Sequence, residues 1–588
     1  MYEEYDIREM PLSLDFNRRS VERFLAENGL RLDGVETYVG VFNADEELVG
    51  GGGLEGEVIK CVAVSESERG TGLMARIVSR LQSVAAAQGH TTTMVFTKPG
   101  NLALFRDLGY VLLAEAPEAI LMESSPQRLF RYQRTWQEAV AQTETERLEP
   151  AGVGVIVMNA NPFTRGHQYL VEQAARQVGR LAVMVVSEER SAFPFAERLA
   201  MVKAGTAHLH NVCVVETGPY AISAATFPTY FLKELSTAAE TQMQLDLNLF
   251  RRHVAPALGA GVRFVGTEPA DMLTCRYNEL MKATLLPSGL HVVEIERLEG
   301  ISASKVRDGA WLLVPGTSLP YVLAHYACCA MQEELDLTPK PGLVDRHDSG
   351  AHSDMDYALM SRSIRTLRPY FREIAEVAVR PSFSVKDLQE VGLRAERAML
   401  EATGGVNTHR GALFCLGLAV AAAARLAAAA VLPPAGFPAA LQEEIRRLAR
   451  QFPEASGTHG AAVRKRYPGV KSALQNACEG FSEAFAARTA EAGLPQLLAI
   501  MSRLDDTNIL YRCGAEVAEE VKQTAVRFLC DGFTEEDVAA LNEDFSRRGI
   551  SPGGAADMYA LCCFLRILLR HEGSKSQGDR TPCDAGKE

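Results

Sequence analysis

Short β-branched runs alternate with helical patterns along the first part of the chain. Residues 37–42 and 58–64 are apolar and rich in valine, and turn-forming residues separate them. Both runs predict strands, and residues 72–87 have the apolar spacing of a helix. The pattern predicts an α+β domain over residues 1–127, followed by a polar helical linker at residues 128–150.

Strand and helix then alternate at a regular spacing over residues 151–315. Residues 154–158 are an uncharged β-branched run, which is typical of a central parallel strand. Further strands are predicted at residues 181–186, 212–216, 262–265 and 292–295. This alternation predicts an α/β Rossmann-like domain with a parallel sheet and helices on both faces.

Beyond residue 315 the pattern changes to long helical segments rich in alanine and leucine. They predict an all-α domain over residues 316–572, and the polar residues 573–588 predict a disordered tail. The most apolar run, residues 413–432, contains Arg425. A charge at that position is costly in lipid, so a buried helix is favoured over a membrane span.

Composition narrows the class of protein. A chain of 588 residues is too long for one core, and its net charge of -13 argues against a nonspecific binder of nucleic acid or of anionic membranes. Its twelve cysteines form no CxxC pair, and the acidic N-terminus lacks the layout of a signal peptide. We therefore expect a cytoplasmic protein with reduced thiols.

The first candidate site follows the strand at residues 154–158. The run Asn161 to His167, Asn-Pro-Phe-Thr-Arg-Gly-His, lies where this strand leads into a helix, and free N–H groups at a helix start suit a phosphate. Gly166 allows close approach of the backbone, and His167 can donate a hydrogen bond to an α-phosphate. The alternative is a surface loop in which Thr164 caps the helix.

A second motif lies about 140 residues further on, the spacing that a nucleotide-binding fold of this kind needs. Residues 301–307 place the hydroxyls of Ser302 and Ser304 at a helix start and the cations Lys305 and Arg307 one turn later. This arrangement suits the β- and γ-phosphates of ATP, and the alternative is an ordinary helix cap.

Together these motifs resemble citrate lyase ligase, a family of the HxGH nucleotidyltransferase superfamily, and residues 191–198, 265–269 and 277–278 also look like that family. The resemblance covers residues 151–311, with Thr164 in place of the superfamily's first histidine. It implies acetylation of the citrate lyase prosthetic-group thiol with ATP and acetate, through acetyl-adenylate. Plain adenylyl transfer is the competing reaction. The implied roles are catalysis by His167 and Thr164 and ATP binding by Asn161, Gly166, Arg198, Ser302, Ser304, Lys305 and Arg307.

The N-terminal domain resembles GNAT acetyltransferases. Arg69, Gly70 and Gly72 match the loop that presents backbone N–H groups to the coenzyme A pyrophosphate, and residues 101–110 match a later helix. Met74 departs from the small residue of that pattern. A degenerate domain that docks the carrier's thiol arm or shapes the ligase site is therefore favoured over an active acetyltransferase.

The helical domain carries the third cluster. Lys340, Asp345, His352, Asp354 and Asp356 fall among prolines and glycines just before a predicted helix. Carboxylates can hold Mg²⁺ that keeps waters and substrate phosphates, and a lysine can neutralise phosphate. The alternative is a proline-rich loop whose acids complement a helix dipole.

Three further clusters favour function, at residues 404–411, 505–512 and 551–557, and the set resembles triphosphoribosyl-dephospho-CoA synthase over residues 319–570. That resemblance implies glycosyl transfer from ATP to the ribose 2'-hydroxyl of 3'-dephospho-CoA, with release of adenine. Tyr511, Cys513 and residues 469–481 depart from the family pattern. The implied roles are Mg²⁺ binding by Asp354, Asp356 and Asp506, ATP binding by Lys340, Asn407, His409, Arg410 and Arg512, and proton handling by His352 or Asp345.

The combined prediction is a bifunctional enzyme of citrate lyase maturation, built from a GNAT-like α+β domain, an α/β nucleotidyltransferase domain and an all-α domain. Its expected ligands are ATP, acetate and 3'-dephospho-CoA, with Mg²⁺, and its expected partner is the acyl carrier subunit of citrate lyase. Neither nucleic acid nor membrane is expected. The alternatives are prosthetic-group synthesis for malonate decarboxylase and a catalytically decayed scaffold that binds the carrier.

Overall fold

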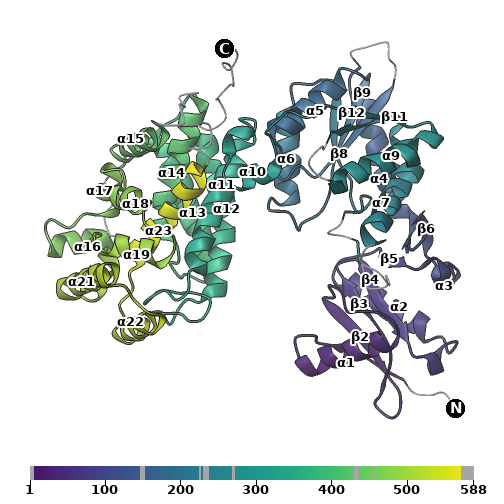
Figure 1. The fold of residues 1–588 in the computed structure, drawn as a ribbon, viewed down its shortest axis with the longest axis horizontal. Helices are drawn as coiled ribbons and strands as arrows, with labels where there is room; N and C mark the ends of the chain where they lie inside the picture. Colours follow the sequence, from purple (N-terminus) through teal and green to yellow (C-terminus); the bar gives the residue numbers. More distant parts are fainter. Residues whose placement is uncertain are drawn as a thin grey trace, which may run out of the picture. The chain divides into compact units, whose positions relative to one another are not determined.

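The computed structural model describes residues 5–145, 152–223, 227–228, 237–267, 272–429, 436–453 and 459–570. Two compact units make up the chain, one of Met1–Asn161 with Gly166–Gly300 and the other of Pro162–Arg165 with Ile301–Glu588. The first contains both sheets and the second is helical (Figure 1). The predicted tail at residues 573–588 lies outside the described residues, as does the end of the predicted linker.

A seven-stranded mixed sheet forms the N-terminal part of the first unit, in the order β1-β2-β3-β4-β5-β7-β6. Only β4 and β5 run parallel among these neighbours. The elements are β1 (Asp6–Met10), α1 (Asp15–Glu27), β2 (Thr37–Phe42), β3 (Leu48–Glu55), β4 (Val58–Val64), α2 (Leu73–Ala87), β5 (Met94–Thr97), α3 (Leu102–Asp107), β6 (Val111–Glu115) and β7 (Ile120–Glu123). The predicted α+β domain, its two strands and its helix are confirmed.

A five-stranded parallel sheet follows, in the order β10-β9-β8-β11-β12. Its elements are β8 (Val153–Met158), α5 (Arg165–Ala175), β9 (Arg180–Val185), α6 (Phe195–Thr206), β10 (Val212–Glu216), α7 (Ala238–Leu249), the π-helix η4 (Phe250–Val254), α8 (Ala255–Leu258), β11 (Ala260–Gly266), α9 (Met272–Leu285) and β12 (His291–Ile295). Every strand predicted here is present. Helices α5 and α6 lie on one side of the sheet and α4 (Pro126–Gln142), α7 and α9 on the other (Figure 1).

Helix α4 is the helix predicted as a linker, and it packs in the core between the two sheets. Its Trp136 is fully buried in the same core as Ala182 and Met184 of β9, and its indole Nε1 donates to the Glu216 carbonyl at 2.9 Å. Near its start, Arg128 donates to Glu123 of β7 at 2.7 Å. The helix therefore ties the mixed sheet to the parallel sheet within one unit.

The second unit is all helical over its described residues, as predicted. Its elements are α10 (Ala303–Arg307), η6 (Trp311–Leu313), α11 (Leu319–Asp336), α12 (Tyr357–Ala378), α13 (Val385–Ala402), α14 (Arg410–Ala428), α15 (Phe437–Ala449), α16 (His459–Arg466), α17 (Ala473–Cys478), α18 (Ser482–Ala487), α19 (Leu494–Met501), α20 (Thr507–Arg512), α21 (Ala515–Asp531), α22 (Glu535–Arg548) and α23 (Gly553–Leu569). Helices α11, α12, α14 and α23 pack together as its centre. Residues 301–315 cluster with these helices rather than with the sheet that precedes them.

Helix α14 is long and apolar enough to cross a membrane, the one such helix among the described residues, yet 67% of its most apolar window is buried inside the fold. Half of its buried residues are alanines, which allow α12, α15 and α23 to approach it closely. This burial agrees with the predicted core helix.

Truncating Trp136 to alanine is expected to lower the free energy of unfolding of the first unit by about 3–5 kcal/mol, because a fully buried indole and its hydrogen bond to Glu216 are lost. Urea unfolding followed by circular dichroism measures this. The control is Phe130→Ala on the same helix, since Phe130 is 65% exposed and its loss should cost under about 0.5 kcal/mol. Equal effects of the two substitutions would contradict the burial of Trp136.

Candidate functional sites

A cavity of about 850 Å³ lies in the helical unit, a volume in the range that holds nucleotide-sized ligands. Residues from α11 to α14, α16, α17, α20 and α23 line it. Among the residues predicted from sequence, those that line this cavity are Lys340, His352, Asp354, Asn407, His409, Arg410 and Arg512. Asp345, Asp356 and Asp506 do not line it, and each has a structural task instead.

Lys340 is buried in the cavity wall and paired with an acid that the sequence did not single out. Its Nζ donates to the Glu334 carboxylate at 2.5 Å and to the Glu334 carbonyl at 2.9 Å. Both side chains are almost fully buried, so the carboxylate offsets the desolvation of the ammonium. One ammonium proton remains for a ligand oxygen.

Asp345 organises the loop that carries Lys340. Its carboxylate accepts hydrogen bonds from the backbone N–H groups of Lys340, His347 and Asp348, at 3.2, 2.7 and 3.1 Å. Both of its oxygens are used in this way and the residue is buried. Proton handling, predicted for His352 or Asp345, therefore fits the position of His352 better.

His352 and Asp354 face each other at the cavity wall. The Nε2 atom of His352 lies 2.8 Å from the Ser551 hydroxyl, and its Nδ1 lies 3.7 Å from an Asp354 oxygen, beyond hydrogen-bond distance. Burial, and then the charge of Arg512, lowers the pKa of His352. A neutral imidazole with one nitrogen beside a carboxylate is suited to accept a proton.

Asp356, two residues after Asp354, caps helix α12. Its carboxylate accepts the backbone N–H of Leu359 at 2.8 Å, the geometry of an N-cap. The carboxylate of Asp354 is 60% exposed and lines the cavity. The predicted pair of metal ligands is thus split between a cavity residue and a capping residue.

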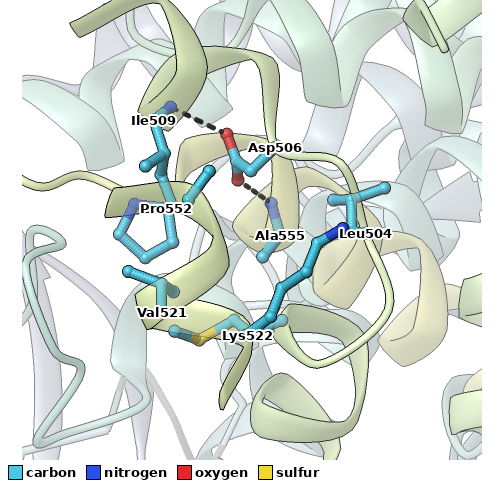
Figure 2. A pocket seen from close by; sticks show the side chains of 9 residues that line it. Leu504, Asp506, Ile509, Val521, Lys522, Pro552 and Ala555 are labelled. Atoms are coloured by element: carbon cyan, nitrogen blue, oxygen red, sulfur yellow. Dashed lines mark hydrogen bonds between the residues drawn. The ribbon is translucent and has the colours of Figure 1, made fainter. Parts of the chain in front are cut away.

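Asp506 is buried and joins two segments of chain through hydrogen bonds (Figure 2). One oxygen accepts the N–H groups of Asn508 and Ile509 at the start of α20, and the other accepts the N–H of Ala555 in α23. Burial raises the pKa of this carboxyl despite those donors. With its oxygens occupied and its side chain outside the cavity, Asp506 fits a structural role better than the predicted metal ligand.

His409 is buried and lines the cavity. Its Nδ1 lies 2.8 Å from the Ser363 hydroxyl, which also accepts from Thr408 at 2.7 Å. Since Ser363 accepts from Thr408, its own proton points to Nδ1, which leaves the ring proton on Nε2. That Nε2 has no protein partner and lines the cavity, so it is a donor for a ligand.

Asp557 is a cavity residue that the sequence identified only as the end of a tight turn. A Cβ on residue 411 would lie 1.8 Å from the Asp557 carboxylate, so any residue larger than Gly411 would displace this carboxylate. Burial, and then the nearby Asp506 and Glu334, raises the pKa of Asp557 well above the ordinary value. Burial therefore favours the neutral form of this carboxyl group.

Among the described residues, no group of three or more His, Cys, Asp or Glu side chains is arranged to hold a metal ion. Mg²⁺ does not need such a cage, because it commonly binds one or two carboxylates together with substrate phosphates and waters. Of the three predicted ligands, Asp354 alone presents its carboxylate to the cavity.

In the first unit, the candidate nucleotide site lies at the carboxyl ends of β8 and β11. Both strands are central, and the chain runs outward from them in opposite directions, which makes this edge the topological switch point of the sheet. Arg198 organises this edge from inside. It is fully buried and donates to Phe193 O at 3.0 Å, to Asn159 O and Oδ1 at 2.8 and 2.7 Å, to Val186 O at 2.8 Å and to Glu188 O.

Because most of its donors are directed at these strand ends, Arg198 orders the backbone of this edge, and its predicted contact with ATP stays a prediction. Asn161 has a similar task, since its Oδ1 accepts the Phe193 N–H at 3.1 Å. Gly166 and His167 lie in the first turn of α5. Burial, and then the charge of Arg297, lowers the pKa of His167 to about 4.

A neutral His167 can still donate one hydrogen bond, as the motif requires. Arg297, two residues after the end of β12, is a cation near His167 that sequence reasoning missed, since a single arginine after a strand has no signature of its own. Asn278, of the family-like pair at 277–278, donates to Gly266 O at 3.3 Å and so supports the end of β11. Glu268 and Pro269 lie outside the described residues.

The remaining ligase-motif residues belong to the helical unit. Thr164 is buried, and Arg165 Nε donates to the Val314 carbonyl at 3.2 Å. Ser302 caps α10 by accepting the Lys305 N–H at 3.2 Å, and its hydroxyl lies 3.0 Å from that of Ser304. Ser304 and Lys305 are exposed, and Arg307 is partly buried.

The loop predicted to bind coenzyme A leads into α2. Gly70 and Gly72 have φ of 87° and 85°, a backbone region that favours glycine. Gly72 is the N-cap residue and offers no side-chain cap. The N–H groups at the start of α2 thus lack a side-chain partner at the cap, as an anion site requires.

Comparison with known proteins decides the family of each half. Residues 153–311 match the model of the citrate lyase ligase C-terminal domain. The [citrate [pro-3S]-lyase] ligase of Escherichia coli (strain K12) is 42% identical over 300 residues, which are 49% of this chain and 83% of that protein. Residues 320–576 match the model of ATP:dephospho-CoA triphosphoribosyl transferase. A probable 2-(5''-triphosphoribosyl)-3'-dephosphocoenzyme-A synthase of Pseudomonas putida is 39% identical over 275 residues, which are 42% of this chain and 95% of that protein.

The chain belongs to both the citrate lyase ligase and the triphosphoribosyl-dephospho-CoA synthase families. Both are enzyme families, so the two resemblances seen in the sequence are confirmed. A solved structure of a putative acyl-CoA N-acyltransferase from Klebsiella pneumoniae matches 20% of this chain and 95% of that chain, with 18% identity and a TM-score of 0.18.

Burial of neutral His409 predicts a pH dependence of stability in the synthase half. Burial, and then the charge of Lys340, lowers the pKa of His409 to about 3, whereas the unfolded histidine titrates near 6.5. Between these values the unfolded chain binds more protons, so stability falls as the pH falls below 6.5, by up to about 1.4 kcal/mol per pH unit. His409→Gln should make this slope shallower by one proton in urea unfolding between pH 5 and 6.5.

The control for this measurement is His347→Gln, because His347 is exposed on the same unit. Equal slopes for wild type and His409→Gln would show that His409 is not buried in its neutral form.

Proposed function

We propose that this chain makes the precursor of the citrate lyase prosthetic group and acetylates the group once it is on its carrier. The synthase half joins the triphosphoribosyl unit of ATP to the 2'-hydroxyl of 3'-dephospho-CoA and releases adenine. The ligase half uses ATP and acetate to form acetyl-adenylate and diphosphate, then transfers acetyl to the prosthetic-group thiol with release of AMP. The observation that carries the proposal is the presence of both family matches, side by side, on one chain.

The chemistry of the cavity supports the synthase reaction. Glycosyl transfer needs a base near the attacking hydroxyl and a proton donor near the departing purine. The cavity wall offers His352, whose pKa burial lowers, and Asp557, whose pKa burial raises. Lys340 and Arg512 supply positive charge for the triphosphate, and the Nε2–H of His409 supplies a neutral donor. Mg²⁺ would enter with ATP and be held by Asp354, and it would neutralise phosphate charge there.

The ligase site supports attack of acetate on the α-phosphate. A neutral His167 at the start of α5 and the cation Arg297 are the groups that stabilise negative charge as it develops. The carrier subunit of citrate lyase is the proposed partner, and the cytoplasm is the proposed compartment. The ligase half favours citrate lyase over malonate decarboxylase, because its family and its relatives are named for citrate lyase.

Both reactions can be followed by chromatography of nucleotides and bases. With ATP, Mg²⁺ and 3'-dephospho-CoA we expect free adenine, and with ATP, acetate and deacetylated citrate lyase carrier we expect AMP. His167→Ala should lower AMP formation at least about 100-fold and leave adenine formation unchanged, because a donor to the reacting phosphate is lost only at the ligase site. A folded protein that forms neither product would be the carrier-binding scaffold instead.

The split between Asp354 and Asp356 can be tested by a matched pair of substitutions. Asp354→Asn should lower adenine formation about 100-fold and raise the Mg²⁺ requirement, because a charged ligand of the cavity is lost. Asp356→Asn should retain activity within about threefold, since asparagine also caps helices well. The reverse ranking would place the metal ligand at Asp356 and contradict the structural role given to it.

A further inference from the structure

The segment that carries the second ATP motif of the ligase is packed on helices of the synthase half. The hydroxyl of Tyr326, on α11, donates to the carbonyl of Val306 in α10, and both residues are buried. Trp311 Nε1 donates to Leu568 O of α23 at 3.1 Å, and its ring lies 5.4 Å from that of Phe437 on α15. Three helices of the synthase half thus hold residues 306–311.

Gly309 shows how close this packing is. It has φ of 112°, and a Cβ there would lie 2.3 Å from the carbonyl oxygen of Ile567 in α23. Such a distance is far below van der Waals contact, so the backbone of α23 occupies the space that any other residue would need. The turn after α10 is therefore fitted directly to the last helix of the synthase half.

The first ligase motif is connected to the same segment. Arg165 Nε donates to Val314 O at 3.2 Å, and residues 162–165 cluster with the helical unit. Val306 lies between Lys305 and Arg307, the two cations implied to bind the ATP phosphates. Fixing the Val306 carbonyl fixes the rotation of α10 about its axis, and with it the direction in which both cations leave the helix.

We propose that α11 and α23 of the synthase half position the triphosphate-binding segment of the ligase, with Tyr326 as the positioning residue. The inference rests on the proposed ligase function of residues 301–307. Tyr326 lies beyond the ligase family match, which ends at residue 311. The 300 matched residues are 83% of the Escherichia coli relative, and the rest of that protein is far too short for a counterpart of the helical half. The dependence therefore belongs to this fused chain.

The test is Tyr326→Phe in the full chain, which removes one hydroxyl and keeps the ring. The ligase KM for ATP should rise about three- to tenfold, the loss of one hydrogen bond, with kcat changed less than about twofold. Adenine formation by the synthase half should keep its KM and kcat. Trp311→Phe, which removes the donor to Leu568, should give the same split. Tyr559→Phe is the control, an equally buried tyrosine on α23, and should change neither activity.

A ligase KM for ATP equal to that of wild type in both variants would overturn the proposal. Parallel loss of both activities would overturn it too, because Tyr326 would then only stabilise the helical unit. A third outcome, a wild-type chain with no ligase activity, would instead refute the proposed function.

Amide hydrogen exchange separates that last case, since it does not depend on catalysis. In Tyr326→Phe, exchange over residues 303–314 should be faster than in wild type while the rest of α11 and α23 keeps its protection. Unchanged exchange in residues 303–314 would contradict the anchoring by itself, whatever the ligase activity.

Discussion

Burying a carboxylate is costly unless hydrogen-bond donors replace the water it loses, and the synthase half is arranged around that constraint. Asp506 is supplied by backbone N–H groups from two separate segments, and Asp345 by three N–H groups of its own loop. Glu334 receives the ammonium of Lys340. Each buried acid thereby fixes a loop, and the loops so fixed are those that present His352, Lys340 and Arg512 to the cavity.

At the ligase site the buried charge is a cation, which needs hydrogen-bond acceptors to replace the water it loses. Arg198 lies among carbonyl groups at the ends of β8 and β9, with nearly all its donors directed at main-chain oxygens. Its burial lowers its own pKa, and the nearby Glu188 and Glu189 partly restore it. A charged residue that is conspicuous in sequence thus serves the backbone geometry of the site, while burial keeps the pKa of His167, at the start of α5, well below its ordinary value.

The sequence predicted the architecture well because strand and helix periodicity extend over whole elements. All five strands of the parallel sheet and the helical character of the second unit follow from spacing alone. Seven of the cavity residues followed from motifs. Spacing could not separate Asp354 from Asp356, because both are aspartates that can cap a helix, and which of them bonds to Leu359 depends on the local backbone. Glu334 was missed as a site residue because it lies within α11 with no motif around it. Asp557 ends the cluster at residues 551–557, but the pattern there indicated no individual role for it.

The polar composition of α4 predicted a linker, although one face of the helix is part of the core. That face carries Leu129, Trp136 and Val140. The apolar residues of α4 have amphipathic spacing, but a linker helix and a core helix both have a polar exposed face, so the sequence alone does not distinguish them. Burial of one face is decided by what lies opposite it, here β9 and β10, and that information is not local.

The connection between the two families explains why their fusion has structural consequences. Only residues 312–319 separate the two family matches, and they form the end of a packed segment that leads directly into α11. A flexible tether would isolate each half from changes in the other. Here the turn at Gly309 abuts the backbone of α23, so any shift of that helix must move the end of the ligase sequence with it. A substitution that shifts α23 is therefore expected to shift the end of the ligase motif as well.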